Sequence, residues 1–157
     1  VATIQLDLNM PERFNLTHIN EKGEKERVVM IHAAIMGAIE RFLAVLIEHT
    51  AGALPTWLSP VQVAVLPISQ KQKKYAAQVI EELDQKEIRT ELLDANETIG
   101  KRIREAELKK IPYLLVVGDK ETKDKSVAVR KRGKGDTGTK KLNTFISSIK
   151  KEVEAKK

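Results

Sequence analysis

The chain of 157 residues contains no cysteine. It therefore has no disulfides, thiolate metal ligands or cysteine nucleophiles, and this absence is compatible with the reducing cytoplasm in which we expect the protein to lie. No stretch approaches the roughly 20 consecutive apolar residues of a membrane span, and the first residues lack the basic and then apolar pattern of a signal peptide. We expect no membrane partner. Internal repeats are absent, and the lysine-rich end is the one biased segment.

Charge is distributed unevenly along the chain. Up to Pro60 there are 5 Lys and Arg against 7 Asp and Glu, whereas from Val61 onward there are 23 against 15, and the formal net charge is +6. The positive field therefore belongs to the C-terminal part, where it favours a polyanion such as RNA. A well-solvated basic surface is the alternative interpretation.

The composition, 41% hydrophobic and 32% charged, fits one globular domain with an attached piece. The segment from Ala51 to Pro60, which holds two prolines, is the best boundary, so we predict domains at residues 1–54 and 55–157. In the first domain, alternation predicts a strand at Thr3–Leu8, a polar turn precedes a second strand at Val28–Ile31, and helical spacing of apolar residues runs from Ala34 to His49.

Strand and helix patterns alternate in the second domain. Apolar runs predict strands at 61–68, 88–93, 113–117 and 126–130, and apolar spacings predict helices after Ser69, over 98–110 and from a cap near Thr139. The third and fourth strands are expected to pair as an antiparallel hairpin across a charged turn at 119–125. The expected fold is a three-layer α/β/α domain with a mainly parallel mixed sheet.

Several motifs carry a resemblance to a known family. They are Thr3–Asp7 (TIQLD), Met30–His32 (MIH), Gly37–Phe42 (GAIERF), Pro55–Val63 (PTWLSPVQV), Asn96–Gly100 (NETIG), Ile103–Leu108 (IREAEL) and Ile111–Glu121 (IPYLLVVGDKE). In this order they resemble the C-terminal part of the bacterial-type threonyl-tRNA synthetase family, with GAIERF as the third signature motif of a class II aminoacyl-tRNA synthetase.

For the first domain, the resemblance implies a truncated remnant of the class II antiparallel sheet followed by the motif 3 helix. In the family, the residue matching Arg41 lies on ATP, the one matching Gln5 contacts the adenylate or the tRNA end, and the one matching His32 is a zinc ligand. The parent enzyme uses ATP, magnesium and zinc and is a homodimer. Ala33 and Ala38 depart from the family pattern.

Each of these roles requires upstream partners, so we expect this polypeptide alone to bind no cofactor and to catalyse no threonine-dependent pyrophosphate exchange. The strands of the first domain would normally join a larger sheet. They should therefore leave open edges and apolar surface, and be partly disordered, repacked on the second domain or paired with another chain.

For the second domain, the resemblance implies a complete anticodon-binding domain whose partner is the anticodon stem-loop of tRNA(Thr). Asn96, Glu121 and Arg130 match family residues that read the anticodon bases, and their donors and acceptors suit base edges. Thr98 stands where some members have lysine and is better explained as a helix cap. Contacts to tRNA phosphates are expected from basic residues near the readers in sequence: Lys101, Arg102, Lys131, Arg132 and Lys134.

Each residue has a structural alternative. Arg130 and Glu121 could form an exposed ion pair across a hairpin, and Asn96 could be a turn residue. Trp57 is better explained as a packing anchor at the domain junction than as a stacking platform, and Tyr75 as part of the core. His18 and His49 have no neighbour at metal-binding spacing.

Three functions remain open from sequence. The leading one is tRNA anticodon recognition by the C-terminal region of a threonine–tRNA ligase. The second is a standalone, non-enzymatic RNA-binding or accessory protein built on the anticodon-binding fold. The third is an interaction scaffold with no RNA role.

Overall fold

The computed structural model describes residues 2–156 and divides the chain into two compact units, residues 1–49 and 50–157, which are treated separately below. Val1 and Lys157, the outer ends of the two predicted domains, lie outside the described residues. The division falls before the predicted boundary at residues 54 and 55. Residues 53 and 54 go with the C-terminal unit because the Arg132 guanidinium donates to both of their carbonyls.

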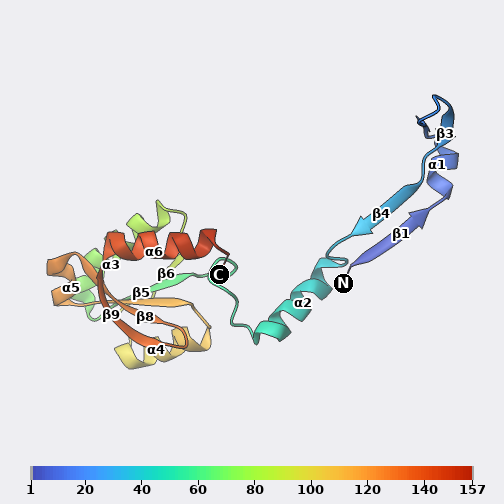
Figure 1. The fold of residues 1–157 in the computed structure, drawn as a ribbon. Helices are drawn as coiled ribbons and strands as arrows, with labels where there is room; N and C mark the ends of the chain where they lie inside the picture. Colours follow the sequence, from blue (N-terminus) through green and yellow to red (C-terminus); the bar gives the residue numbers. More distant parts are fainter. Residues whose placement is uncertain (1, 157) are drawn as a thin grey trace. The chain divides into compact units, whose positions relative to one another are not determined.

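The N-terminal unit consists of two small antiparallel ribbons and two helices (Figure 1). Strand β1 (Thr3–Asp7) pairs with β4 (Met30–Ala34), and between them lie α1 (Asn9–Arg13) and a second ribbon of β2 (Thr17–Ile19) and β3 (Lys25–Arg27). Helix α2 (Ile39–Thr50) follows. It begins later than the predicted Ala34 because that residue ends β4 and pairs with Thr3.

Large apolar side chains remain exposed on the β1–β4 ribbon. Ile4, Leu6 and Ile31, which alternate along one face, are 78%, 61% and 62% exposed. Helix α2 has the hydrophobic spacing of an amphipathic helix and yet buries no residue fully. The predicted open edges and apolar surface are therefore confirmed for this unit.

The C-terminal unit contains a mixed five-stranded sheet in the order β6-β5-β7-β8-β9. Strands β6 (Thr90–Leu92), β5 (Val63–Pro67) and β7 (Tyr113–Val117) run parallel, and β8 (Ser126–Lys131) pairs antiparallel with β7, as predicted. Strand β9 (Gly135–Lys141) adds an edge that the sequence analysis missed. The predicted cap at Thr139 is wrong, because this residue lies in β9.

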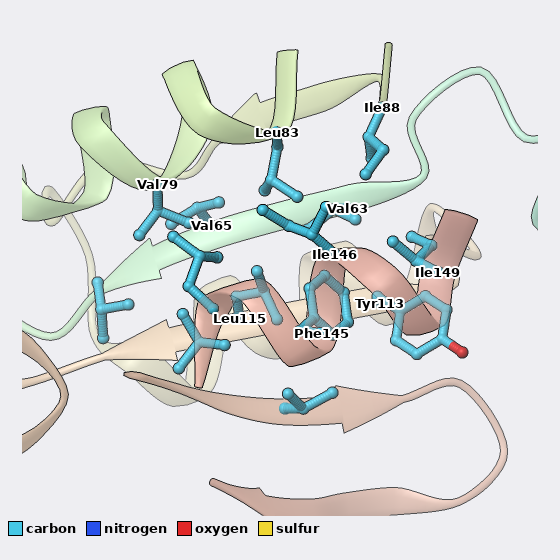
Figure 2. Close-up of a cluster of buried hydrophobic side chains, with 14 of the residues drawn as sticks. Val63, Val65, Val79, Leu83, Ile88, Tyr113, Leu115, Phe145, Ile146 and Ile149 are labelled. Atoms are coloured by element: carbon cyan, nitrogen blue, oxygen red, sulfur yellow. The ribbon is translucent and has the colours of Figure 1, made fainter. Parts of the chain in front are cut away.

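Helices cover both faces of the sheet, which confirms the three layers. A 3₁₀ turn (Gln70–Gln72) leads into α3 (Lys73–Asp84), and α3 and α6 (Leu142–Glu154) pack on one face around the larger apolar cluster (Figure 2). On the other face α4 (Ile99–Leu108) packs against a smaller cluster from β5 and β7. In the larger cluster Val63, Val65 and Leu115 have no exposed surface.

A short helix, α5 (Asp119–Asp124), replaces the charged turn predicted between the third and fourth strands. Its stabilisation is local: the Glu121 carboxylate accepts the Gly118 amide at 3.0 Å. No helix in the described part of the chain is long and apolar enough to cross a membrane.

Candidate nucleic-acid interface

Two predicted readers lie at one edge of the sheet, where the parallel strands end. Asn96 follows β6, and Glu121 follows β7 in the first turn of α5. Because β5, β6 and β7 run in the same direction, the loops after them meet at their carboxyl ends. This edge is the usual ligand-binding side of an open α/β sheet.

The loop that carries Asn96 is anchored by its neighbours. Asp94 accepts hydrogen bonds from the Lys73 ammonium and the Ala95 amide, which lower the pKa of its carboxyl, Lys73 having the larger effect. The Thr98 hydroxyl accepts the Lys101 amide, so the prediction that Thr98 caps a helix is confirmed. Between these anchors Asn96 is exposed, and its side-chain amide makes no hydrogen bond within residues 2–156.

Glu121 lies in α5, three residues after Gly118 at the end of β7. A Cβ added at Gly118 would lie 2.8 Å from Ile68 Cδ1 and 3.0 Å from Glu121 Oε2, so the ends of these two side chains would have to shift. Glu121 Oε2 accepts the Gly118 amide, while Oε1 accepts no hydrogen bond from the described residues. One acceptor oxygen is therefore available to a ligand.

Arg130 lies on β8, opposite Leu114 of β7 and Asp136 of β9. Its partner Leu114 belongs to the cluster on the α4 face, so the Arg130 side chain points to that face. Arg130 is half-buried, and its Nε is buried with no hydrogen-bond partner in the described chain. No ion pair with Glu121 is found within residues 2–156, which contradicts the alternative interpretation of these two residues.

The three predicted readers do not all lie at the edge where the parallel strands end. Leu114 lies three residues before the end of β7, so Arg130 is displaced by about 10 Å along the sheet from the edge that carries Asn96 and Glu121. Three stacked nucleotides at about 3.4 Å each cover a similar length. Because four of the five residues of β7 are buried, a ligand that spans this distance would have to pass over β8.

The five predicted phosphate contacts separate into two groups. Lys101 is exposed and forms an (i, i+4) ion pair with Glu97 at 2.9 Å, and Lys134 is exposed with no ion pair to the described residues. An exposed ion pair is weak and easily exchanged for a phosphate. Lys101 and Lys134 are therefore accessible to a phosphate.

Arg102, in contrast, is a structural residue. It is 3% exposed and donates to the carbonyls of Glu97, Pro67 and Leu93 at 2.8–3.0 Å. It thereby ties the loops after β5 and β6 together. This corrects the prediction that Arg102 meets a phosphate, because its donors are already satisfied inside the protein.

Lys131 and Arg132 are also engaged. The Lys131 ammonium lies 2.8 Å from Glu152 Oε2 and 4.9 Å from the centre of the Tyr113 ring. Burial raises the pKa of Glu152, but hydrogen bonds from Lys131, Thr56 and Tyr113 outweigh burial and leave it lowered. The Arg132 guanidinium donates to main-chain carbonyls. The charged groups of Lys131 and Arg132 therefore both already have partners inside the protein.

Tyr75 takes the core position expected from sequence. The Tyr75 hydroxyl donates to the Ser126 carbonyl from a position in the core. Trp57 is half-buried, with the Lys156 ammonium 5.9 Å from its ring centre.

In the N-terminal unit, Gln5 and His32 are direct partners across β1 and β4. His32 Nε2 lies 2.8 Å from Asp7 Oδ2, and the pKa of Asp7 is lowered by the Met10 amide and by His32. Arg41 is exposed in the first turn of α2.

The predicted zinc ligand has one acidic neighbour. Within residues 2–156 no group of three His, Cys, Asp or Glu side chains could hold a metal ion, whereas zinc takes about three protein ligands. The described residues by themselves do not fit zinc.

Sequence reasoning missed Arg89, Gln62 and Glu152, which hold the segment before β5 in place. Their partners are main-chain atoms or residues far away in sequence. No local pattern indicates such contacts.

Comparisons with known proteins identify the family of the chain. Residues 62–152 match the family model described as an anticodon binding domain, and residues 1–50 match the class II core domain of the tRNA synthetases abbreviated G, H, P, S and T. Because the first match covers more than half of the chain, the chain belongs to the anticodon-binding domain family.

The relatives specify the kind of synthetase. The chain is 53% identical over 99% of its length to the threonine–tRNA ligase of Carboxydothermus hydrogenoformans and 55% identical to that of Caldanaerobacter subterraneus, and it spans about a quarter of each. The RNA binding domain of threonyl-tRNA synthetase from Cryptosporidium parvum aligns with a TM-score of 0.87 at 40% identity, covering 96% of this chain and 38% of that one. Prolyl-tRNA synthetase from the same organism gives a TM-score of 0.72 at 25% identity, covering 99% and 34%.

Proposed function

We propose that the C-terminal unit binds the anticodon stem-loop of tRNA(Thr) as part of a threonine–tRNA ligase. The observation that carries this proposal is Arg130, a half-buried residue with an unsatisfied Nε and no carboxylate partner within residues 2–156. A buried donor without a partner is costly, and a ligand that accepts its hydrogen bonds removes that cost.

The three readers have complementary chemistry. Arg130 presents a fork of donors that suits the O6 and N7 acceptors of guanine. Asn96 offers one acceptor and two donors, and the remaining oxygen of Glu121 can accept from an exocyclic amine or an imino group. Sequence-specific RNA recognition usually targets unpaired loop bases, which expose these edges.

Lys101 and Lys134 are proposed to contact phosphates. Such contacts fix the position of the loop without reading its sequence, and they make the affinity fall as salt rises. The excess positive charge of the chain after Val61 favours the same partner.

For the N-terminal unit we propose only a contribution to the parent ligase, which would attach threonine to tRNA with ATP. Arg41 is exposed and its planar guanidinium could face ATP, and Gln5 lies on the same ribbon face as His32. Zinc binding is not assigned to His32 on the described residues alone, and the dimeric state of the parent family is an expectation for the complete ligase.

The test compares Arg130→Ala with Arg130→Lys on stem-loop RNAs that differ at single anticodon positions. Arg130→Ala should weaken binding of the matched RNA by about 1–3 kcal/mol and relax discrimination at one base. Arg130→Lys keeps the charge but loses the fork, so it should restore part of the affinity and little of the discrimination. Equal weakening of all RNAs by Arg130→Ala would contradict base reading.

A further inference from the structure

Residues 53–59, named the entry segment here, lead into β5 without helix or strand structure except for a short turn. The segment is nevertheless well packed, since Thr56 and Ser59 are each 4% exposed. Immediately before it, Ala51 and Gly52 have φ angles of +49° and +73°. An alanine in this left-handed region is strained.

Two arginines hold the main chain of the entry segment. Arg132, which follows β8, donates through Nη2 to the carbonyls of Ala53 and Leu54 at 3.2 and 2.6 Å, and through Nη1 to the Lys110 carbonyl. Arg89 donates to the carbonyls of Trp57 and Ser59 at 2.8–3.0 Å. The planar guanidinium of Arg132 thereby bridges the entry segment and the end of α4.

Two further side chains fix Thr56. Glu152 of α6 accepts its hydroxyl, and the Gln62 amide, 1% exposed, donates to its carbonyl at 3.0 Å. The entry segment is thus attached to the body of the C-terminal unit and is not a loose linker.

Arg132 also borders the base-reading residue. A cavity of about 420 Å³ is lined by Arg130 and Arg132 on β8 and its turn, by Ala53 of the entry segment, and by Lys110 and Ile111 after α4. A nucleotide held by Arg130 at this cavity would lie against the entry segment and against the arginine that holds it.

We infer that Arg132 is a positioning residue that couples RNA binding at Arg130 to the rigidity of the entry segment; this inference rests on the proposed function. An RNA that fills the cavity restricts Ala53 and Arg132 and so stabilises the Arg132 bridge. Coupling is reciprocal, so a segment already held by Arg132 also favours the RNA. Lysine cannot replace this arginine, because a single ammonium cannot bridge both sets of carbonyls.

The test is residue-resolved hydrogen exchange of the 157-residue chain with and without the tRNA(Thr) anticodon stem-loop. The amides of Leu58 and Ser59, which donate to the Pro55 carbonyl, report on the entry segment. In the unmodified protein, saturating RNA should slow their exchange at least about fivefold, the lower end of typical coupling between sites. Arg132→Lys should abolish this slowing and weaken RNA binding by the same factor, although the charge is unchanged.

Arg104→Lys is the matched control, because Arg104 is exposed on α4 and makes no hydrogen bond to the described residues through its side chain. It should leave both the slowing and the affinity unchanged. If the unmodified protein bound the RNA without slowed amide exchange, the coupling would be contradicted while the proposed function would stand. The same conclusion would follow if the Arg132→Lys protein kept the slowed exchange. Failure of the unmodified protein to bind the RNA would contradict the proposed function itself.

Discussion

Replacing Arg102 with alanine tests whether this arginine stabilises the fold or binds RNA. The substitution removes the donors that satisfy three main-chain carbonyls, those of Glu97, Pro67 and Leu93, at the carboxyl edge of the sheet. Water can enter only partly, because Arg102 is 3% exposed. The carbonyls at this edge should therefore lose most of their hydrogen bonding.

The magnitude follows from these contacts. A hydrogen bond from a charged group contributes about 1.5–3 kcal/mol, so three would give about 5–9 kcal/mol if they added. Partial hydration and relaxation of the loops reduce this sum, and removing one member of a buried charged network typically costs about 3–5 kcal/mol. We expect Arg102→Ala to lower the free energy of unfolding by about 3–5 kcal/mol.

Urea unfolding followed by Trp57 fluorescence measures this change, since Trp57 is the sole tryptophan and lies in the C-terminal unit. Arg104→Ala is the control, because Arg104 is exposed on the same helix, and its effect should stay within about 0.5 kcal/mol. If Arg102→Ala lowered the free energy of unfolding by less than about 1 kcal/mol and made RNA binding weaker and less dependent on salt, the structural role would be refuted. Arg102 would then be assigned to a phosphate contact.

Three further predictions concern stability. Glu152→Gln should lower the free energy of unfolding by about 2 kcal/mol at pH 7. The pKa of Glu152 is lowered on folding, so the stability that its carboxylate contributes is present above the unfolded pKa of about 4.3 and is lost as pH falls through the folded pKa. The difference in unfolding free energy between the two proteins, measured by denaturation, should therefore shrink towards pH 3. Thr98→Ala removes a helix cap and should cost about 1 kcal/mol in the same urea assay, and no measurable change would contradict the cap. Leu115→Ala should cost about 2–5 kcal/mol, whereas Leu108→Ala, at a position 70% exposed, should have little effect, and equal effects would show that the core is wrongly placed.

The sequence predicted the parts of the fold that have strong local signals. Buried strands such as β7 are continuous apolar runs, and the caps at Ser69 and Thr98 are short polar signals next to amphipathic helices. Strand β9 has no such signal, because it is an exposed edge rich in glycine and lysine that is formed by pairing with β8. Helix α5 is too short to show apolar periodicity.

The candidate site was predicted as a set of residue types but not as an arrangement. Position in the chain correctly placed Asn96 and Glu121 after parallel strands, but it could not show that the Arg130 Nε is buried without a partner. For arginines the distinction between phosphate contact and structural anchor depends on tertiary contacts. Arg102 and Arg132 bond to carbonyls that their sequence neighbourhood does not specify.

The central claim is that this chain reads the anticodon of tRNA(Thr), and the direct measurement is its affinity for two stem-loop RNAs that differ only in the anticodon. At a fixed, stated salt concentration, the threonine stem-loop should bind at least about tenfold more tightly than the swapped one, since each base contact is worth about 1–3 kcal/mol of discrimination. Equal affinities for the two RNAs would contradict the claim.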